Sequence, residues 1–331
     1  MADRVLLAHG SGGKLSHDLV QDLIATISNP ILDRLDDSAV FELGGRLAFT
    51  TDSYIVSPIF FPGGDIGKLA VCGTVNDLSM SGATPLYLSL SLIIEEGLPL
   101  ADLEKIVESI RLTAREAEVQ IITGDTKVVN QGSADKLFIN TSGIGLVPEG
   151  INASGANARP GDRVIINGSV GDHGIAILSQ REGIRFNTPI KSDCAPLNKL
   201  VAEILSADVH CLRDPTRGGL ATTLNEFAGQ SGVGIRIYED RIPVNEAVLG
   251  ACELLGFDPL YIANEGKVVA IVAPADADRV LSRMKQNQYG TMAAIIGEVV
   301  TEHQGRVIMK TRLGSSRIVD MPVGELLPRI C

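Results

Sequence analysis

Residues 148–162 divide the chain into two parts of similar length. The segment is rich in Gly, Pro, Asn and Ser, and it lies between two apolar runs, 137–147 and 164–167, that we interpret as strands. At 331 residues the chain is long enough for two domains, each with its own core. Strand-like and helix-like patterns alternate irregularly on both sides, which is typical of α/β or α+β layers. We therefore predict two domains, 1–150 and 151–319, followed by a tail, 320–331.

The hydrophobic spacing within each part predicts its main elements. Apolar residues three or four apart predict helices at 15–27, 66–75, 103–110 and 197–205 and one that ends near Leu254. Apolar and alternating runs predict strands at 86–94, 119–123, 137–147, 164–167 and 234–238. We also predict two hairpins, with strands at 40–43 and 46–51 and at 260–263 and 268–273.

A glycine-rich loop precedes the first predicted helix, with the sequence Gly10-Ser11-Gly12-Gly13-Lys14. Backbone N–H groups and the positive end of the helix dipole can bind an anion at such a place, and Lys14 adds a positive charge. The loop is not a Walker A motif, which has a different glycine spacing and a hydroxyl after the lysine. By itself, a loop of this kind is more often an ordinary turn.

Five aspartates form a second group of candidate residues. We interpret all of them as lying at strand ends or beside short turns: Asp36, Asp37, Asp52, Asp77 and Asp125. Carboxylates gathered without histidine suit a hard cation, and Mg²⁺ usually binds together with substrate phosphates. Lys127 and the glycine-rich loop could then offset the phosphate charge. Any single one of these aspartates is also compatible with ordinary turn chemistry.

The last residues are Leu327-Pro328-Arg329-Ile330-Cys331, so a thiol stands at the end of the sequence. Pro328 disfavours a helix here, and we predict an extended, mobile tail. A thiol on such an arm can carry an acyl-type group from one site to another. A prenylation box is not expected, because it needs residues after the cysteine. Cys331 is therefore a candidate group carrier, with a chance terminal cysteine as the alternative.

Charge and cysteine content argue against several classes of function. The formal net charge is −11 and no Lys/Arg cluster interrupts the acidic background, so we expect no nucleic-acid partner. The five cysteines form an odd number without a CxxC pair, which indicates a reducing compartment. Four of them are predicted to be small core residues: Cys72, Cys194, Cys211 and Cys252. No stretch approaches the roughly 18 apolar residues of a membrane span, so we expect a cytoplasmic protein with no membrane partner.

Seven short motifs occur in one order along the whole chain. They are Gly10-Ser11-Gly12-Gly13, Asp36-Asp37-Ser38-Ala39, Thr51-Asp52-Ser53, Asn76-Asp77, Gly124-Asp125-Thr126-Lys127, Asp214-Pro215-Thr216-Arg217-Gly218-Gly219 and Asn264-Glu265-Gly266-Lys267. Each motif alone is weak, but the ordered set resembles the ATP-dependent superfamily of aminoimidazole ribonucleotide synthetase and selenophosphate synthetase. Within it, the terminal Pro-Arg-Ile-Cys resembles the branch that acts in hydrogenase maturation.

The superfamily resemblance implies a two-domain α/β fold and a homodimer in which two N-terminal halves complete one β-barrel. Residues 1–150 would then be the ATP-binding and dimerisation domain. ATP would contact Gly10, Ser11, Gly12, Gly13, Lys14, Asp36, Asp52, Asn76, Gly124 and Thr126. Mg²⁺ would be bound by Asp37, Asp77 and Asp125, while Lys127 would contact phosphate as a catalytic residue.

The hydrogenase maturation branch implies a cargo for Cys331. The carbamoyltransferase HypF would load a carboxamide onto this thiol. ATP would phosphorylate the amide oxygen, and loss of phosphate and a proton would leave a thiocyanate. The HypC–HypD complex would then receive cyanide for the iron of a nickel-iron hydrogenase. Glu265, in the predicted hairpin turn, is the candidate general base for the amide protons, with a solvent-facing turn residue as the alternative.

Two other functions remain compatible with the sequence. One is a different reaction of the superfamily, such as selenophosphate synthesis or phosphoryl transfer of the kinase type. Selenophosphate synthetases are expected to carry a reactive Cys or selenocysteine near the N-terminal glycine loop, whereas the first cysteine here is Cys72. The other is a non-catalytic thiol carrier, against which the intact acidic motifs argue.

Overall fold

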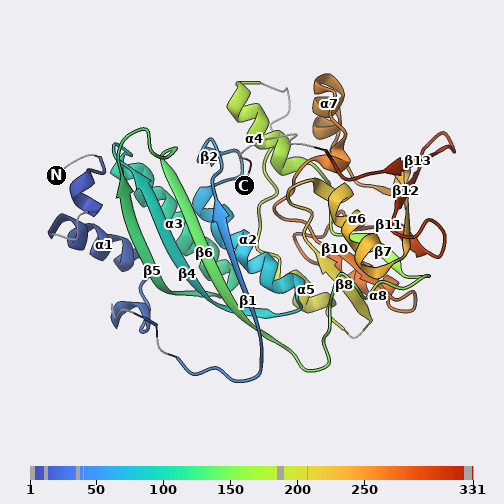
Figure 1. Cartoon of the computed structure of the whole chain (residues 1–331), viewed down its shortest axis with the longest axis horizontal. Coiled ribbons are helices and arrows are strands. Elements are labelled where there is room, and N and C mark those ends of the chain that lie inside the picture. The colour runs from blue at the N-terminus through green and yellow to red at the C-terminus, as the bar shows by residue number, and fades with distance from the viewer. Residues whose placement is uncertain are drawn as a thin grey trace.

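The computed structural model describes residues 4–10, 14–34, 38–39, 41–184, 190–206, 208–323 and 330. Two sheet-containing halves lie side by side along the long axis of the molecule (Figure 1). The N-terminal half contains a four-stranded sheet and the C-terminal half a seven-stranded sheet. The predicted α/β class is therefore confirmed.

The N-terminal sheet has the strand order β1-β6-β4-β5. Its strands are β1 (Arg46–Tyr54), β4 (Thr84–Glu95), β5 (Gln120–Val129) and β6 (Leu137–Val147). β4 and β5 run parallel, and the other two pairs are antiparallel. A small hairpin of β2 (Phe60–Phe61) and β3 (Gly64–Asp65) precedes the helix α2 (Ile66–Met80).

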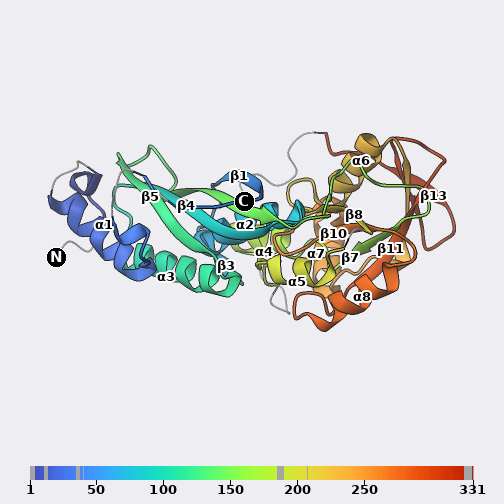
Figure 2. The ribbon, with the colours of Figure 1, turned by 90° about the horizontal axis from the view of Figure 1, so that it is seen from below.

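One face of this sheet is covered by helices. α2 packs against β1 and β6, and α3 (Leu100–Ala117) packs beside α2, with α1 (Lys14–Ile27) against α3. Figure 2 shows α1 and α3 on the same side of the sheet. Residues at every second position of the strands point at these helices, as Thr50 does toward Asp77 of α2.

No described helix covers the opposite face of the N-terminal sheet, although the ring of Phe41 packs on Tyr87 of β4 there at 4.7 Å between centroids, and we name it the open face. Apolar side chains point from it into solvent, with exposed fractions of 49% for Leu47, 70% for Phe49 and 41% for Ile93. The strand neighbours of Ile93, Leu92 and Ile94, are buried, so the alternation is that of a sheet with one covered side. Among the described residues, no strand pairs with the outer edge of β1 or of β5, so a monomer exposes these apolar side chains on a sheet with two unpaired edge strands.

The C-terminal sheet has the strand order β13-β12-β9-β11-β7-β10-β8. Its strands are β7 (Arg163–Ile166), β8 (Val209–Arg213), β9 (Gly234–Tyr238), β10 (Val269–Val272), β11 (Ala294–Val300), β12 (Val307–Lys310) and β13 (Ser316–Val319). The helices of this half are α4 (Asp172–Glu182), α5 (Asn198–Ile204), α6 (Gly219–Ser231), α7 (Glu246–Leu255) and α8 (Ala277–Gln286). No described helix is long and apolar enough to cross a membrane.

A shared core joins the two halves. One cluster of buried side chains contains Val71 and Cys72 of α2 together with Ile175 of α4, Cys194 and Ile330. All four cysteines predicted as core residues are buried. Because α2 belongs to the N-terminal sheet and α4 to the C-terminal half, this cluster fixes the halves against each other along one side of α2.

The helices and most strands match the predictions, but both predicted hairpins are wrong. β1 pairs with β6, and residues 41–44 form no strand. In the second half, residues 259–261 form a 3₁₀ turn (Pro259–Tyr261), and β10 pairs with β7 and β8 instead. Short apolar runs next to glycine turns suggested that neighbouring segments pair with each other. In the structure these strands form hydrogen bonds with strands that are distant in the sequence.

Candidate active site

The loop Asn264–Lys267 lies at the centre of the site, immediately before β10. Asn264 is buried and donates from its side chain to the carbonyl oxygens of Pro215 and Ile262, at 2.9 and 3.1 Å. Its Oδ1 accepts a hydrogen bond from the backbone N–H of Gly171 at 2.7 Å. The loop is therefore fixed to the starts of both α4 and α6 and is not the free hairpin turn that the sequence suggested.

Asp193 holds the other side of the loop. Its carboxylate accepts from the backbone N–H groups of Glu265 and Gly266 at 3.2 Å and pairs with Lys267 Nζ at 2.8 Å. Burial alone would raise the pKa of Asp193, but Lys267 and the N–H donors outweigh this effect and lower it. A Cβ at residue 266 would collide with the carbonyl oxygen of Asp193, which explains the glycine there.

Glu265 is buried, with 3% of its surface exposed. Its Oε1 has no hydrogen-bond partner among the residues that the structure describes. Burial raises the pKa of Glu265 well above its ordinary value, and the neighbouring Cys194, Asp214 and Asp193 raise it further. An unpartnered buried carboxyl is costly to keep and is typical of a functional site. The alternative of a solvent-facing turn residue is wrong.

A group of carboxylates extends from Glu265 toward the N-terminal sheet. Burial raises the pKa of Asp77 to about 6 and that of Asp214 to about 7, and the charge of Asp52 contributes to both shifts. Asp77 accepts a hydrogen bond from Thr50 Oγ1 at 3.0 Å. Asp52 lies near the end of β1, which agrees with its predicted place at a strand end, and Asp77 lies inside α2, close to the end of that helix at Met80.

Asn76 connects α2 to the central loop. Its Nδ2 donates to the carbonyl oxygens of Ala195 and Glu265 at 3.1 and 3.4 Å, and its Oδ1 accepts from Leu197 N at 2.8 Å. Both amide protons of this buried side chain are therefore used within the protein. The geometry gives Asn76 a positioning role for the Glu265 backbone, whereas the sequence predicted a nucleotide contact.

Asp125 and Lys127 lie on the open face, away from this group. They occupy β5, opposite Ser91 and Ile93 of β4, and form an exposed ion pair of 2.7 Å. The hydrogen bond from Lys127 lowers the pKa of Asp125. The strand predicted at 119–123 is longer than expected, because β5 continues through Asp125 and Lys127 to Val129. Gly124 lies so close to the carbonyl oxygen of Leu90 that a Cβ would collide there.

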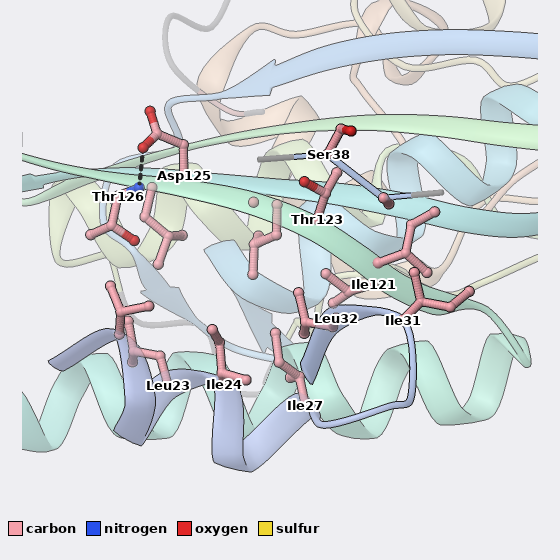
Figure 3. Close-up of a pocket in the computed structure, with 16 residues that line it drawn as sticks. Leu23, Ile24, Ile27, Ile31, Leu32, Ser38, Ile121, Thr123, Asp125 and Thr126 are labelled. Atoms are coloured by element: carbon pink, nitrogen blue, oxygen red, sulfur yellow. Dashed lines mark hydrogen bonds between the residues drawn. The ribbon is translucent and has the colours of Figure 1, made fainter. Parts of the chain in front are cut away.

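A cavity of about 290 Å³ lies behind the same strand, between α1 and the covered face of β4 and β5. Figure 3 shows Leu23, Ile24 and Ile27 of α1 reaching toward it, while Asp125 points away from these side chains. Thr126, the residue between the two open-face charges, lines this cavity. β5 therefore presents Thr126 to an apolar cavity and Asp125 to the opposite face.

Several predicted site residues lie outside the described residues: Ser11, Gly12, Gly13, Asp36, Asp37 and Cys331. Gly10 ends a 3₁₀ turn, and Lys14 is the first residue of α1. Asp77 and Asp125 lie on different sides of the sheet and near opposite edge strands. One described chain thus does not bring Asp77 and Asp125 together, and the third predicted metal ligand, Asp37, lies outside the described residues.

The residue before Cys331 is seated in the protein core. Ile330 is 6% exposed, and its carbonyl oxygen accepts a hydrogen bond of 2.5 Å from Nε2 of His173. His173 follows the cap of α4, and Ser192 lies on its other ring nitrogen at 2.8 Å. No sequence motif assigned a role to His173, Ser192 or Asp193. The glycines around His173 were the only available signal, and Asp193 lies in no motif.

Comparisons with known proteins agree over the whole chain. The model of the AIR synthase related protein N-terminal domain matches residues 35–147, and that of the C-terminal domain matches residues 159–310. Carbamoyl dehydratase HypE of Azotobacter vinelandii is 54% identical, with 99% of this chain and 97% of the relative covered. The protein of the same name from Escherichia coli is 46% identical, with 99% and 100% covered.

A solved structure shares the fold and nearly the full length. The crystal structure of hydrogenase maturation protein HypE in complex with ATP is 51% identical, with a TM-score of 0.96 and coverage of 98% of this chain and 99% of that one. A HypE–HypF complex is also similar, at 52% identity and a TM-score of 0.82, with 94% of this chain and 100% of that one covered. The chain therefore belongs to the HypE family of the AIR synthase superfamily.

Proposed function

We propose that this chain is an ATP-dependent carbamoyl dehydratase that converts a carboxamide on its own Cys331 into a thiocyanate. One observation carries the proposal. The residue that precedes the terminal cysteine is seated in the core through His173, beside Asp193, and Asp193 also binds the backbone of the unpartnered Glu265. Full-length relatives that are 46 and 54% identical are named carbamoyl dehydratase.

The reaction removes the elements of water from a primary amide. The amide oxygen bonds the γ-phosphoryl group of ATP as the bond to ADP breaks, and it then leaves in inorganic phosphate. Both N–H bonds break, their protons pass to a base, and the carbon–nitrogen triple bond forms. The amide oxygen is a poor leaving group until it is phosphorylated. The protein must therefore supply a base for the amide protons and a site without competing water.

Glu265 is the proposed base. Its Oε1 is free of described partners, and its raised pKa makes the ionised carboxylate a stronger base than an exposed glutamate. The surrounding loop is anchored by Asn264, Asn76 and Asp193, so the carboxyl group is held in a fixed position. Burial between the two halves keeps bulk water away from the reacting amide.

We propose that ATP and Mg²⁺ bind across a homodimer formed by two open faces. The exposed Leu47, Phe49 and Ile93 would be buried in a barrel closed by the free edges β1 and β5. If the two-fold axis runs along this barrel, the β1 edge of one chain meets the β5 edge of the other. Asp52 and Asp77 lie on the covered side of β1, so Asp125 and Lys127 of a second copy would approach them across the β1 edge.

The donor set suits Mg²⁺, because these groups are carboxylates without histidine. The described residues of one chain contain no group of three or more His, Cys, Asp or Glu that could hold a metal ion. We therefore propose that Asp77 of one copy, Asp125 of the other, Asp37 and the phosphates of ATP share the ion. When bound, Mg²⁺ neutralises charge on the transferred phosphoryl group, and Lys127 adds a second positive charge there.

The carboxamide and the cyanide need a donor and an acceptor. A HypE relative forms a solved complex with HypF, and we propose HypF as the carbamoyltransferase that loads Cys331 of this chain. The HypC–HypD complex is the proposed acceptor of the cyanide group. Phosphate release tests the whole proposal: one phosphate should form for each loaded chain, and a Cys331→Ser chain, which cannot be loaded, should release none above background.

A further inference from the structure

His173 is the only described side chain that hydrogen-bonds the chain end at Ile330. We propose that His173, with its tautomer fixed by Ser192, is a positioning residue that seats Ile330 and so delivers the group on Cys331 to Glu265. The inference rests on the proposed dehydratase function and adds to it two residues. Four observations support it. Both ring nitrogens of His173 form hydrogen bonds, the Ser192 hydroxyl accepts one from Cys194, and the Ile330 side chain is buried.

The hydrogen-bond directions are fixed by the partners. A carbonyl oxygen only accepts, so the 2.5 Å contact requires that Nε2 of His173 carries a proton and donates to Ile330. Ser192 Oγ accepts from the backbone N–H of Cys194 at 3.0 Å, which leaves its own proton free to donate to Nδ1 at 2.8 Å. Burial lowers the pKa of His173 and favours this neutral form. Every polar atom of the ring and hydroxyl thus has a partner.

Both halves of the molecule hold the ring in place. His173 is fully buried in the first turn of α4, and the ring of Phe61 meets it edge to face at 5.5 Å between centroids. The backbone N–H of Ser192 donates to the carbonyl oxygen of Pro62 at 2.8 Å. The seat for Ile330 is therefore built from the hairpin β2–β3, the start of α4 and residues 190–195 together.

Seating Ile330 restricts the reach of the next residue. Consecutive Cα atoms are about 3.8 Å apart, so a seated Ile330 confines the group carried by Cys331 to the same neighbourhood. Asp193 lies within electrostatic range of His173 and binds the Glu265 backbone. The buried side chain of Ile330 supplies apolar contact, whereas the hydrogen bond from His173 sets its orientation.

The test uses the full-length chain and three variants. His173→Gln keeps an amide donor near the position of Nε2, whereas His173→Asn keeps a group only near Nδ1 and loses the donor to Ile330. His210→Asn is the matched control, because His210 is also buried and paired, with Asp162 at 2.7 Å. Seating is measured as the rate at which a carboxypeptidase releases the last residues of the unloaded chain.

We expect the carboxypeptidase to release these residues about three- to tenfold faster from His173→Asn than from wild type. This change corresponds to the loss of one buried hydrogen bond. His173→Gln should stay near wild type, and His210→Asn should be unchanged. HypF should load all variants equally. With saturating ATP, dehydration of the loaded chain should slow in His173→Asn by a similar or larger factor and recover in His173→Gln.

Two outcomes would overturn the inference. One is a His173→Asn chain with wild-type release and dehydration rates. The other is a His173→Gln chain that is as defective as His173→Asn, because ring packing and not the donor would then matter. If instead the loaded wild-type chain fails to lose water, the proposed function is wrong, and the release rates still decide whether His173 seats Ile330.

Discussion

Asp77 and Asp125 lie on opposite sides of one four-stranded sheet. Asp77 belongs to α2 on the covered side, where Thr50 of β1 donates to it at 3.0 Å. Asp125 projects from β5 on the open face, where it pairs with Lys127. Two strands, β6 and β4, separate β1 from β5. This separation is the reason for the proposal that a site with both carboxylates is shared between two copies of the chain.

Mixing two defective variants tests this shared site. Asp77→Asn and Asp125→Asn should each lose Mg-ATP affinity as pure homodimers, because every site lacks one carboxylate. In a mixed dimer one site carries both substitutions and the other carries none, so random exchange should restore about a quarter of the sites. Calorimetric titration of the mixture measures the recovered fraction. If no binding sites are recovered after subunit exchange has been verified, Asp77 and Asp125 do not belong to one shared site.

We expect the chain to form a dimer through its open face. Phe49→Asp places a charge where a 70% exposed phenylalanine would otherwise be buried between two sheets, so the variant should sediment as a monomer and bind ATP poorly. Leu313→Asp is the matched control, because Leu313 is 97% exposed in the turn between β12 and β13. Sedimentation at micromolar concentration gives the answer. A wild-type monomer in the presence of ATP would contradict the barrel.

Glu265→Gln should separate binding from chemistry. The variant should bind ATP and accept the carboxamide normally, yet dehydrate it about 10² to 10⁴ times more slowly, since the amide protons lose their acceptor. In wild type the rate should rise with pH as Glu265 ionises, and this rise should disappear in the variant. Glu302→Gln, at an exposed glutamate, is the control. A near-normal rate in Glu265→Gln would require another base.

Because Asp77 and Asp214 are buried carboxyl groups, we expect the free energy of unfolding to fall as the pH rises in the absence of ligands. Burial raises their pKa values from the ordinary 3.8 to about 6 and about 7, so the folded chain binds more protons than the unfolded chain in that range. The free energy of unfolding should therefore fall between about pH 4 and pH 7. Asp214→Asn should flatten this slope, and Asp278→Asn, on the exposed side of α8, should not. Urea unfolding across the range measures both, and equal slopes in all three chains would contradict the assignment.

The sequence predicted elements whose pattern is local. The helix of residues 15–27 and the strand of residues 137–147 follow from apolar spacing, and the structure has them within one residue. The two predicted hairpins are wrong because strand pairing depends on partners that are distant in the chain, as in the pairing of β1 with β6. The aspartates at 52, 77 and 125 were recognised as functional candidates, but the helix that carries Asp77 and the strand that carries Asp125 are both longer than predicted.

The remaining part of the site depends on packing that a sequence pattern does not contain. Glu265 was chosen by resemblance, while its burial and its partner-free oxygen follow only from the approach of Asp193 and α2. His173 and Ser192 are distant from Ile330 in the sequence, and the contact between His173 and Ile330 spans 157 residues. No local periodicity connects such residues, so their common role became visible only in three dimensions.

The mass of the C-terminal peptide measures the central claim most directly. The chain is first loaded by HypF, then incubated with or without ATP and digested. The account predicts a carboxamide on Cys331 without ATP and the same peptide lighter by one water with ATP, while Cys72, Cys194, Cys211 and Cys252 stay unmodified. A carboxamide that keeps its full mass with ATP present, or a modification on one of the buried cysteines, would contradict it.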